Sequence, residues 1–113
     1  MKYALLIYKT GSSRDLLSSE AMREAGDAME ADIRALPNVS AVVRLQGIEA
    51  ATTVRFDQGR TLLIDGPFID SKEFLGGLFL LDVANLDEAT AIASRLQEHD
   101  PSGLAIEVRP VVG

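Results

Sequence analysis

No stretch limits the possible folds more than residues 75–83, LGGLFLLDV, which are apolar at nearly every position. A strand with one face in water alternates apolar and polar side chains, whereas a strand covered on both faces is apolar almost throughout. The shorter run TLLI, residues 61–64, has the same character. We therefore expect buried strands in a sheet that is covered on both faces.

Two helices and several further strands surround these runs. Apolar residues at three- and four-residue spacing from Ser19 to Leu36 predict a helix that ends at Pro37. Asn85, with Glu88 three residues later, is typical of the cap of a second helix. The turn DQGR predicts a hairpin in which Gly59 adopts a positive φ. Strands are expected at residues 2–8, 39–46, 52–57, 61–64, 75–84 and 104–110.

This order of elements predicts an α+β fold, a ferredoxin-like β-α-β-β-α-β sandwich with an antiparallel sheet, in one domain over residues 1–113. Two helices cover only one face of such a sheet. A second copy of the sheet is the simplest cover for the other face, so we expect a homodimer whose sheets pack face to face. A ligand pocket is then expected between sheet and helices, or between the two sheets.

Composition and charge exclude several classes of function. A net charge of −6 argues against nonspecific binding to nucleic acid or to an anionic membrane. The absence of cysteine excludes disulfides, thiolate nucleophiles and cysteine-ligated metals. The single histidine, His99, follows a predicted helix, where a cation is favoured, and one histidine argues against a histidine metal site. No apolar stretch approaches the roughly 20 residues of a membrane span. We expect a cytoplasmic protein with no metal and no cofactor.

The segment DGPFIDSKEF between the two apolar runs carries most candidate site residues. Asp65, at a strand end, suits a general base or an anchor for a polar substrate group, but an Asp before Gly-Pro more often holds the turn through backbone hydrogen bonds. Gly66 and Pro67 suit the backbone geometry of that turn. Phe68 is a core residue or a ligand contact. Lys72 is a solvated charge or a cation for an anionic ligand.

Two strand arginines, Arg44 and Arg55, are expected on central strands of the sheet. A charged side chain on an apolar sheet needs a partner, and Asp65 or Glu107 is a plausible one for each. The pair would be either a structural ion pair or a clamp for an anionic ligand.

Gly76 and Gly77 stand inside a predicted strand. Glycine at such a position marks a β-bulge, or a close approach of backbone or ligand. Both explanations are open from the sequence.

The segment DGPFIDSKEFLGG resembles the signature of the YCII-related proteins of the DGPF type: Asp-Gly-Pro-Phe, an acid, Ser or Thr, Lys-Glu, and a Gly-Gly pair. MKYALLIY, ATTVRF, DVANLDEA and IEVRPV are similar to other parts of that family, so the resemblance covers nearly the whole chain. It implies a dimeric α/β barrel built from two ferredoxin-like halves.

The resemblance implies no settled reaction. Relatives in the wider superfamily resemble enzymes that act on ring compounds, including a dehydrochlorinase and, by fold, muconolactone isomerase. YciI-type members carry a histidine near the start of the first helix and an aspartate after the second. Asp100 matches that aspartate, but the segment SSEAMRE has no histidine, so the pair is broken here. Genes for DGPF-type proteins often lie beside those of extracytoplasmic-function sigma factors, a link by association only.

Two hypotheses follow. The first is a protein that binds or transforms a small molecule, as a lyase or isomerase of a small, cyclic compound. Its candidate catalytic residues are Asp65 and Asp100, and its candidate substrate-binding residues are Arg55, Gly66, Pro67, Phe68, Lys72, Gly76 and Gly77. The second is a non-catalytic sensory or interaction protein.

Overall fold

The computed structural model describes residues 1–10, 16–69, 71–99 and 105–113. The elements follow the expected order. They are β1 (Lys2–Thr10), α1 (Leu16–Arg34), β2 (Val39–Arg44), the short 3-10 helix η1 (Ile48–Ala50), β3 (Thr52–Asp57), β4 (Arg60–Asp65), β5 (Glu73–Asp82), α2 (Leu86–Gln97) and β6 (Ala105–Pro110).

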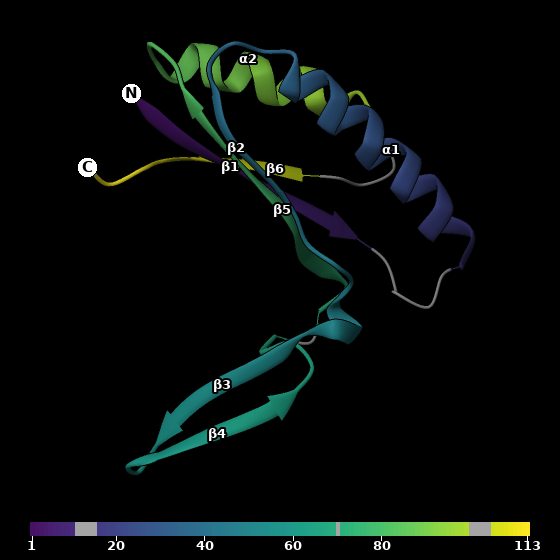
Figure 1. Cartoon of the computed structure of the whole chain (residues 1–113), viewed down its shortest axis with the longest axis vertical. Helices are drawn as coiled ribbons and strands as arrows, with labels where there is room; N and C mark the ends of the chain where they lie inside the picture. The colour runs from purple at the N-terminus through teal and green to yellow at the C-terminus, as the bar shows by residue number, and fades with distance from the viewer. Residues whose placement is uncertain (11–15, 70, 100–104) are drawn as a thin grey trace.

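Four strands form one antiparallel sheet in the order β2-β5-β1-β6. Both helices lie on the same side of this sheet (Figure 1). The predicted α+β class and the ferredoxin-like arrangement are therefore confirmed. No helix in the described part of the chain is both long and apolar enough to span a membrane.

The core lies between the helices and one face of the sheet. Alternate residues of β1 and β5 point into it, as the period of two in a strand requires. The helices contribute residues at three- and four-residue spacing, as the sequence predicts. The buried side chains are Tyr3, Leu5, Ile7, Met29, Ile33, Phe79, Leu81, Val83, Ala89, Ala93 and Leu96.

The opposite face of the sheet is also apolar, but neither α1 nor α2 covers it (Figure 1). Leu6 pairs with Leu78, and Ala4 pairs with Leu80, so these four side chains form a continuous band across β1 and β5. All four are half-buried in the single chain. We call this surface the open face; it is the face that the continuous apolar pattern predicts to be covered.

Strands β3 and β4 form a separate hairpin, which extends away from the four-stranded sheet (Figure 1). We call this hairpin, residues 52–65, the arm. Its two-residue turn has Gln58 at φ 50° and Gly59 at φ 78°, which is the positive-φ turn predicted from the sequence. The expectation that the run TLLI is buried is wrong for the single chain, because every residue of β4 is exposed. Among the described strands β4 pairs only with β3, and no other described layer covers it.

Polar contacts at the second helix follow the expected pattern. The Asn85 side chain accepts a hydrogen bond from the Glu88 N–H at 3.0 Å, and the Glu88 carboxylate accepts one from the Ala84 N–H at 2.6 Å. At the other end of α2, the Asp32 carboxylate of α1 accepts from Arg95 Nε at 2.9 Å and lies 3.1 Å from His99 Nε2. His99 therefore joins the two helices through Asp32.

The expected partners of the two arginines are wrong. Arg44 lies on the edge strand β2 and its guanidinium bonds Asp27 at 2.6 Å and Glu30 at 3.4 Å, both on α1. The carboxylates raise the pKa of Arg44, and Asp27 contributes most. Arg55 lies in the arm, where its guanidinium is 5.5 Å from the centre of the Phe68 ring. The sequence pattern placed Arg44 and Arg55 on strands, but it could not predict which part of the fold each guanidinium group would contact.

Candidate functional site

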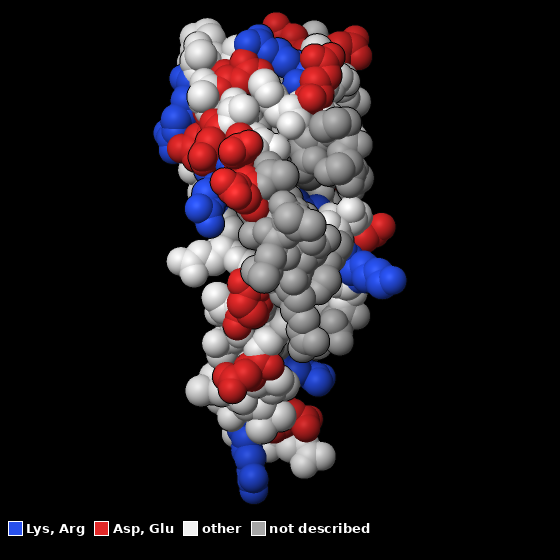
Figure 2. Space-filling model, turned by 90° about the vertical axis from the view of Figure 1, so that its right-hand side faces the viewer, with Lys and Arg blue, Asp and Glu red and all other residues white. Residues whose placement is uncertain are grey.

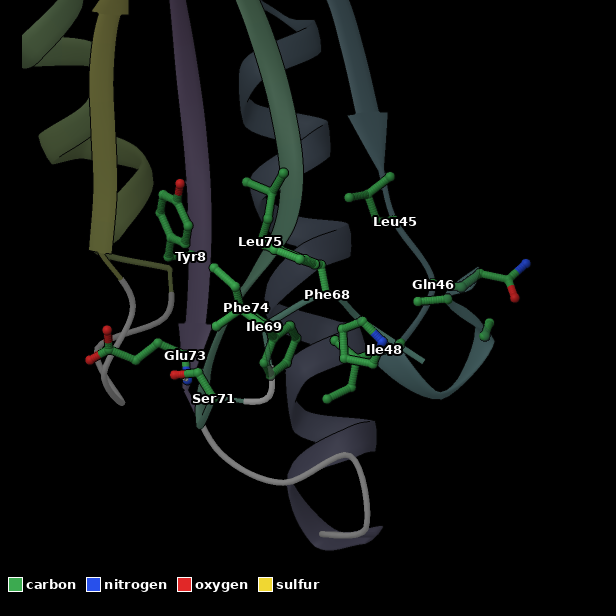
Figure 3. A pocket seen from close by; sticks show the side chains of 14 residues that line it. Tyr8, Leu45, Gln46, Ile48, Phe68, Ile69, Ser71, Glu73, Phe74 and Leu75 are labelled. Carbon is green, nitrogen blue, oxygen red and sulfur yellow. Dashed lines mark hydrogen bonds between the residues drawn. The ribbon is translucent and has the colours of Figure 1, made fainter. Parts of the chain in front are cut away.

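A hollow of about 860 Å³ opens on the helix-free side of the sheet, at the end from which the arm leaves (Figure 3). This hollow is therefore not the expected pocket between sheet and helices, and the expected pocket between two sheets stays a prediction. The side chains and backbone that line it belong to Tyr8, Leu45, Gln46, Gly47, Ile48, Ala50, Ala51, Pro67, Phe68, Ile69, Ser71, Glu73, Phe74 and Leu75.

The floor of the hollow comes from three neighbouring strands. Tyr8 of β1 pairs with Leu75 of β5, so their side chains lie side by side on the helix-free face. Leu45 follows β2 directly, and its N–H donates to the Gly76 carbonyl at 2.9 Å, which extends the ladder by one bond. Figure 3 shows these three side chains in front of the sheet, with α1 behind it.

The walls come from the connections to the arm. Ile48 belongs to η1, on the way into the arm, and Phe68 and Ile69 lie on the way out. Phe68 and Ile69 are 68% and 69% exposed, which is unusual for large apolar side chains beside a hollow. The Arg55 guanidinium stacks on Phe68, so the arm and this wall are in contact.

A few polar groups interrupt the apolar lining. The polar residues of the lining are Tyr8, Gln46, Ser71 and Glu73, and in Figure 3 the Gln46 amide and the Glu73 carboxylate point outward from the labelled apolar side chains. Ser71 Oγ accepts a hydrogen bond from the Glu73 N–H at 3.1 Å, which fixes the start of β5. Glu73 is the one carboxylate among the described residues of the lining. An apolar hollow with a few polar groups is the usual form of a site for a small organic molecule.

A second hollow, of about 290 Å³, adjoins the first along β1. It shares Tyr8 and Glu73 with the larger hollow and adds Thr10 and Glu107. The Tyr8 ring therefore stands between the two spaces, and the rim on this side is acidic. Among the described residues, no cluster of three or more His, Cys, Asp or Glu side chains could hold a metal ion.

The Asp-Gly-Pro-Phe turn is held mainly by the backbone of Gly66. Gly66 has φ 102°, a conformation that favours glycine, and its N–H donates to the Ala51 carbonyl at 2.8 Å. Its carbonyl accepts from Thr53 Oγ1 at 2.7 Å. Asp65, the last residue of β4, is exposed, and its carboxylate makes no hydrogen bond within the described chain. Asp65 does not line the hollow, although Pro67, two residues later, does.

The two strand glycines serve the packing of the sheet. Gly76 lies where the register of β1 and β5 shifts, between Ile7 and Tyr8, so the predicted bulge is confirmed. A Cβ on Gly77 would stand 2.9 Å from the Val43 carbonyl oxygen of the neighbouring strand, so a close backbone approach is also present. Neither glycine lines the larger hollow.

The structure brings only some of the predicted site residues together. Pro67 and Phe68 line the hollow and Arg55 stacks on Phe68, whereas Lys72 is exposed and outside the lining. Asp100 lies outside the described residues. Sequence reasoning missed Tyr8 and Leu45, because each looked like an ordinary strand-end residue. Strand alternation could have identified them, because both side chains fall on the helix-free side of their strands.

Comparison with known proteins agrees with these features. A family model described as the YCII-related domain matches residues 1–112. An uncharacterized protein of Rhizobium meliloti (strain 1021), R00369, is 37% identical over 115 residues, which cover 98% of this chain and 92% of that protein. The chain therefore belongs to the YCII-related family.

Proposed function

We propose that the protein binds a small, mainly apolar molecule in the hollow beside the Asp-Gly-Pro-Phe turn. The observation that carries the proposal is the hollow itself. Its volume of about 860 Å³ lies within the range of about 300–1,000 Å³ that is typical of small-molecule sites. Its lining is mainly apolar, with polar groups at a few points where they can orient a ligand.

The lining favours a neutral ring compound that carries hydroxyl or carbonyl groups. Leu45, Leu75 and Phe68 offer apolar surfaces to a flat ring. The Tyr8 hydroxyl can donate to a ligand oxygen, and the Glu73 carboxylate can accept from a ligand hydroxyl. The same carboxylate disfavours a bound anion close to it.

A lyase or isomerase reaction in this hollow would need a group that moves a proton. Glu73 is the carboxylate in the lining, and Asp65 is the second candidate because it adjoins the turn that forms one wall. We expect Asp65→Asn to leave the melting temperature unchanged, since the carboxylate makes no hydrogen bond within the described chain. If Asp65→Asn lowers the melting temperature, Asp65 is an anchor of the turn. If the variant loses turnover or ligand binding while its melting temperature is unchanged, Asp65 is a site residue.

The open face of the sheet supports a homodimer. Leu6, Leu78 and Leu80 form an apolar band that the single chain leaves half-exposed, beside the hollow. Covering such a band removes apolar area from water, at about 25 cal/mol per Å². A second copy with its own open face would cover both apolar bands at once. The cysteine-free composition favours the cytoplasm as the place where this dimer forms.

A non-catalytic interaction protein is the second candidate. The exposed apolar side chains of the arm favour it, because such side chains are common where proteins meet. A link to an extracytoplasmic-function sigma factor belongs to this candidate.

The proposal is tested by saturation-transfer NMR with phenol, catechol and γ-butyrolactone as probes. Leu45→Arg places a charged side chain in the floor of the hollow. Leu86→Arg is the matched control, since Leu86 is also 49% exposed but lies at the start of α2. We expect saturation transfer to at least one probe with the natural chain and with Leu86→Arg, and its loss with Leu45→Arg. Equal transfer with Leu45→Arg, or none to any probe, would contradict the proposal and favour the second candidate.

A further inference from the structure

We propose that the arm of one copy packs on a second copy and forms the outer wall of that copy's hollow. The proposal rests on the homodimer of the proposed function and adds that each site is incomplete without its partner. The contact surface of the arm is defined by Val54, Phe56 and Leu63.

These three residues lie on one face of the arm. Val54 pairs directly with Leu63, and Phe56 pairs with Thr61, two positions further toward the turn. Directly paired residues share a face, and residues two apart along a strand share it too. Val54, Phe56 and Leu63 are 64%, 77% and 72% exposed, so this face is bare in the single chain.

The other face of the arm is partly occupied by its own chain. There Thr53 Oγ1 donates to the Gly66 carbonyl, and Arg55 stacks on Phe68. Leu62 and Ile64, on the same face, are only 40% and 42% exposed. The arm therefore has one face turned to its own turn and one face left without a partner.

A hairpin in this state needs an external partner. An isolated two-stranded hairpin is at best marginally stable in water, and it becomes stable when a further layer packs on it. Within the part of the chain that the structure describes, β3 and β4 pair only with each other, and Figure 1 shows the arm extending away from the helices and the sheet. Three large apolar side chains on one face are the residues that such a layer would cover.

The hollow of a second copy fits this face. Its lining is apolar but open to solvent, and it lies on the same side of the sheet as the open face that the dimer covers. Each six-residue strand of the arm spans about 20 Å, long enough to cross a neighbouring subunit's hollow. In a two-fold dimer the same contact forms twice, so both arms lose their bare face together.

Charge supports the same arrangement. Arg60 lies at the far end of the arm, and Figure 2 shows basic side-chain atoms at that end of the molecule. The hollow has an acidic rim, formed by Glu73 and Glu107 of the two adjoining spaces. Asp57 pairs with Arg60 across the same end of the arm, so this end carries both charges, and Arg60 is the group that would meet the acidic rim of the second copy.

The natural chain has no cysteine, so single engineered cysteines give a direct test by cross-linking. Phe56→Cys is prepared with one affinity tag and Leu45→Cys with another, and the mixed dimers are treated with a short bismaleimide. We expect a cross-linked species that carries both tags. Leu86→Cys replaces Leu45→Cys in the control, because it is equally exposed but lies at the start of α2. A yield of the two-tag species no higher than in this control would overturn the proposal.

A second measurement uses the double variant Phe56→Ser/Leu63→Ser and its control Leu86→Ser. The arm face is already exposed in the single chain, so these changes should leave the chain folded. We expect the dimer dissociation constant, measured by sedimentation, to rise at least about tenfold in the double variant and to stay unchanged in the control. An unchanged dissociation constant in the double variant would overturn the proposed arm contact. That result would still be compatible with a dimer held together by the packed sheets alone. Binding of the ring-compound probes is measured separately, so failure of the arm and failure of the binding proposal are distinguished.

Discussion

Among the described glycines, Gly77 is the one at which an added Cβ would meet the backbone of a neighbouring strand. The Val43 carbonyl oxygen of the neighbouring strand lies where a side chain would begin, at 2.9 Å from an added Cβ. Gly76, one residue earlier, is less constrained, because an added Cβ would meet the side chain of Lys9, whose carbon atoms can move. An added Cβ would therefore meet backbone at Gly77 and a movable side chain at Gly76.

Gly77→Ala should therefore lower the free energy of unfolding by about 1–3 kcal/mol, the usual cost of an added group in a packed position. Gly76→Ala is the matched control and should cost clearly less. Urea denaturation followed by circular dichroism measures both. Equal losses in the two variants would contradict the assignment of the close approach to Gly77.

At the same scale, the sequence identified the turn at Asp65 to Phe68 but not the residues around it. Pro67 and Phe68 were visible because they follow an apolar strand and break its pattern. Tyr8 and Leu45 were not singled out, because each looks like an ordinary strand-end residue, and the pairing of Tyr8 with Leu75 depends on a register that the bulge at Gly76 shifts. A local pattern cannot report such a shift.

Among the elements, α1 and α2 are joined by one carboxylate. Hydrogen bonds from Arg95, and then from His99, hold the pKa of Asp32 below its ordinary value. A depressed pKa in the folded state means that the charged carboxylate stabilises the fold above the pKa of the unfolded chain. That stabilisation is lost as the pH falls through the lower, folded pKa.

Asp32→Asn should therefore destabilise the protein at neutral pH, by roughly 1 kcal/mol, since Arg95 is more than half exposed and water weakens the pair. The difference from the natural chain should shrink as the pH falls below the ordinary aspartate pKa of about 3.9. Glu24→Gln removes an exposed carboxylate from the same helix and serves as the control. Denaturant titrations across this pH range test the prediction, and a stability difference independent of pH would rule it out.

Most elements could be predicted from the sequence. The stripe that includes Met29 and Ile33 identified the first helix, and the Asn85 cap identified the second, because both signals are local. The hairpin at residues 52–65 was predicted as well, but not its separation from the sheet. The pattern of a strand shows which of its faces is buried, but not which strands lie next to it in a sheet. For this reason Arg55 was expected on a central strand.

At the scale of the whole molecule, two apolar surfaces remain without cover in the single chain: the open face of the sheet and the bare face of the arm. The sequence indicated the first through the continuous run at residues 75–83, because a strand apolar on both sides needs two partners. The run TLLI indicated that β4 also needs cover, but it gave no sign that β3 and β4 would form a hairpin apart from the four-stranded sheet.

Leu80→Glu tests the role of the open face. The charge can stay solvated in the single chain, where Leu80 is half-buried, but it would have to lose water between two sheets. We expect light scattering to give the mass of a monomer for Leu80→Glu and of a dimer for both the natural chain and Leu86→Glu. A dimeric Leu80→Glu would show that the open face is not the contact.

The most direct measurement of the central claim is a crystal structure of the natural chain grown with saturating catechol. We expect two copies whose open faces meet and a catechol ring enclosed in the hollow between Tyr8, Leu45 and Leu75. Copies that meet only through their helices, with the hollow open to solvent and catechol bound elsewhere or absent, would contradict it.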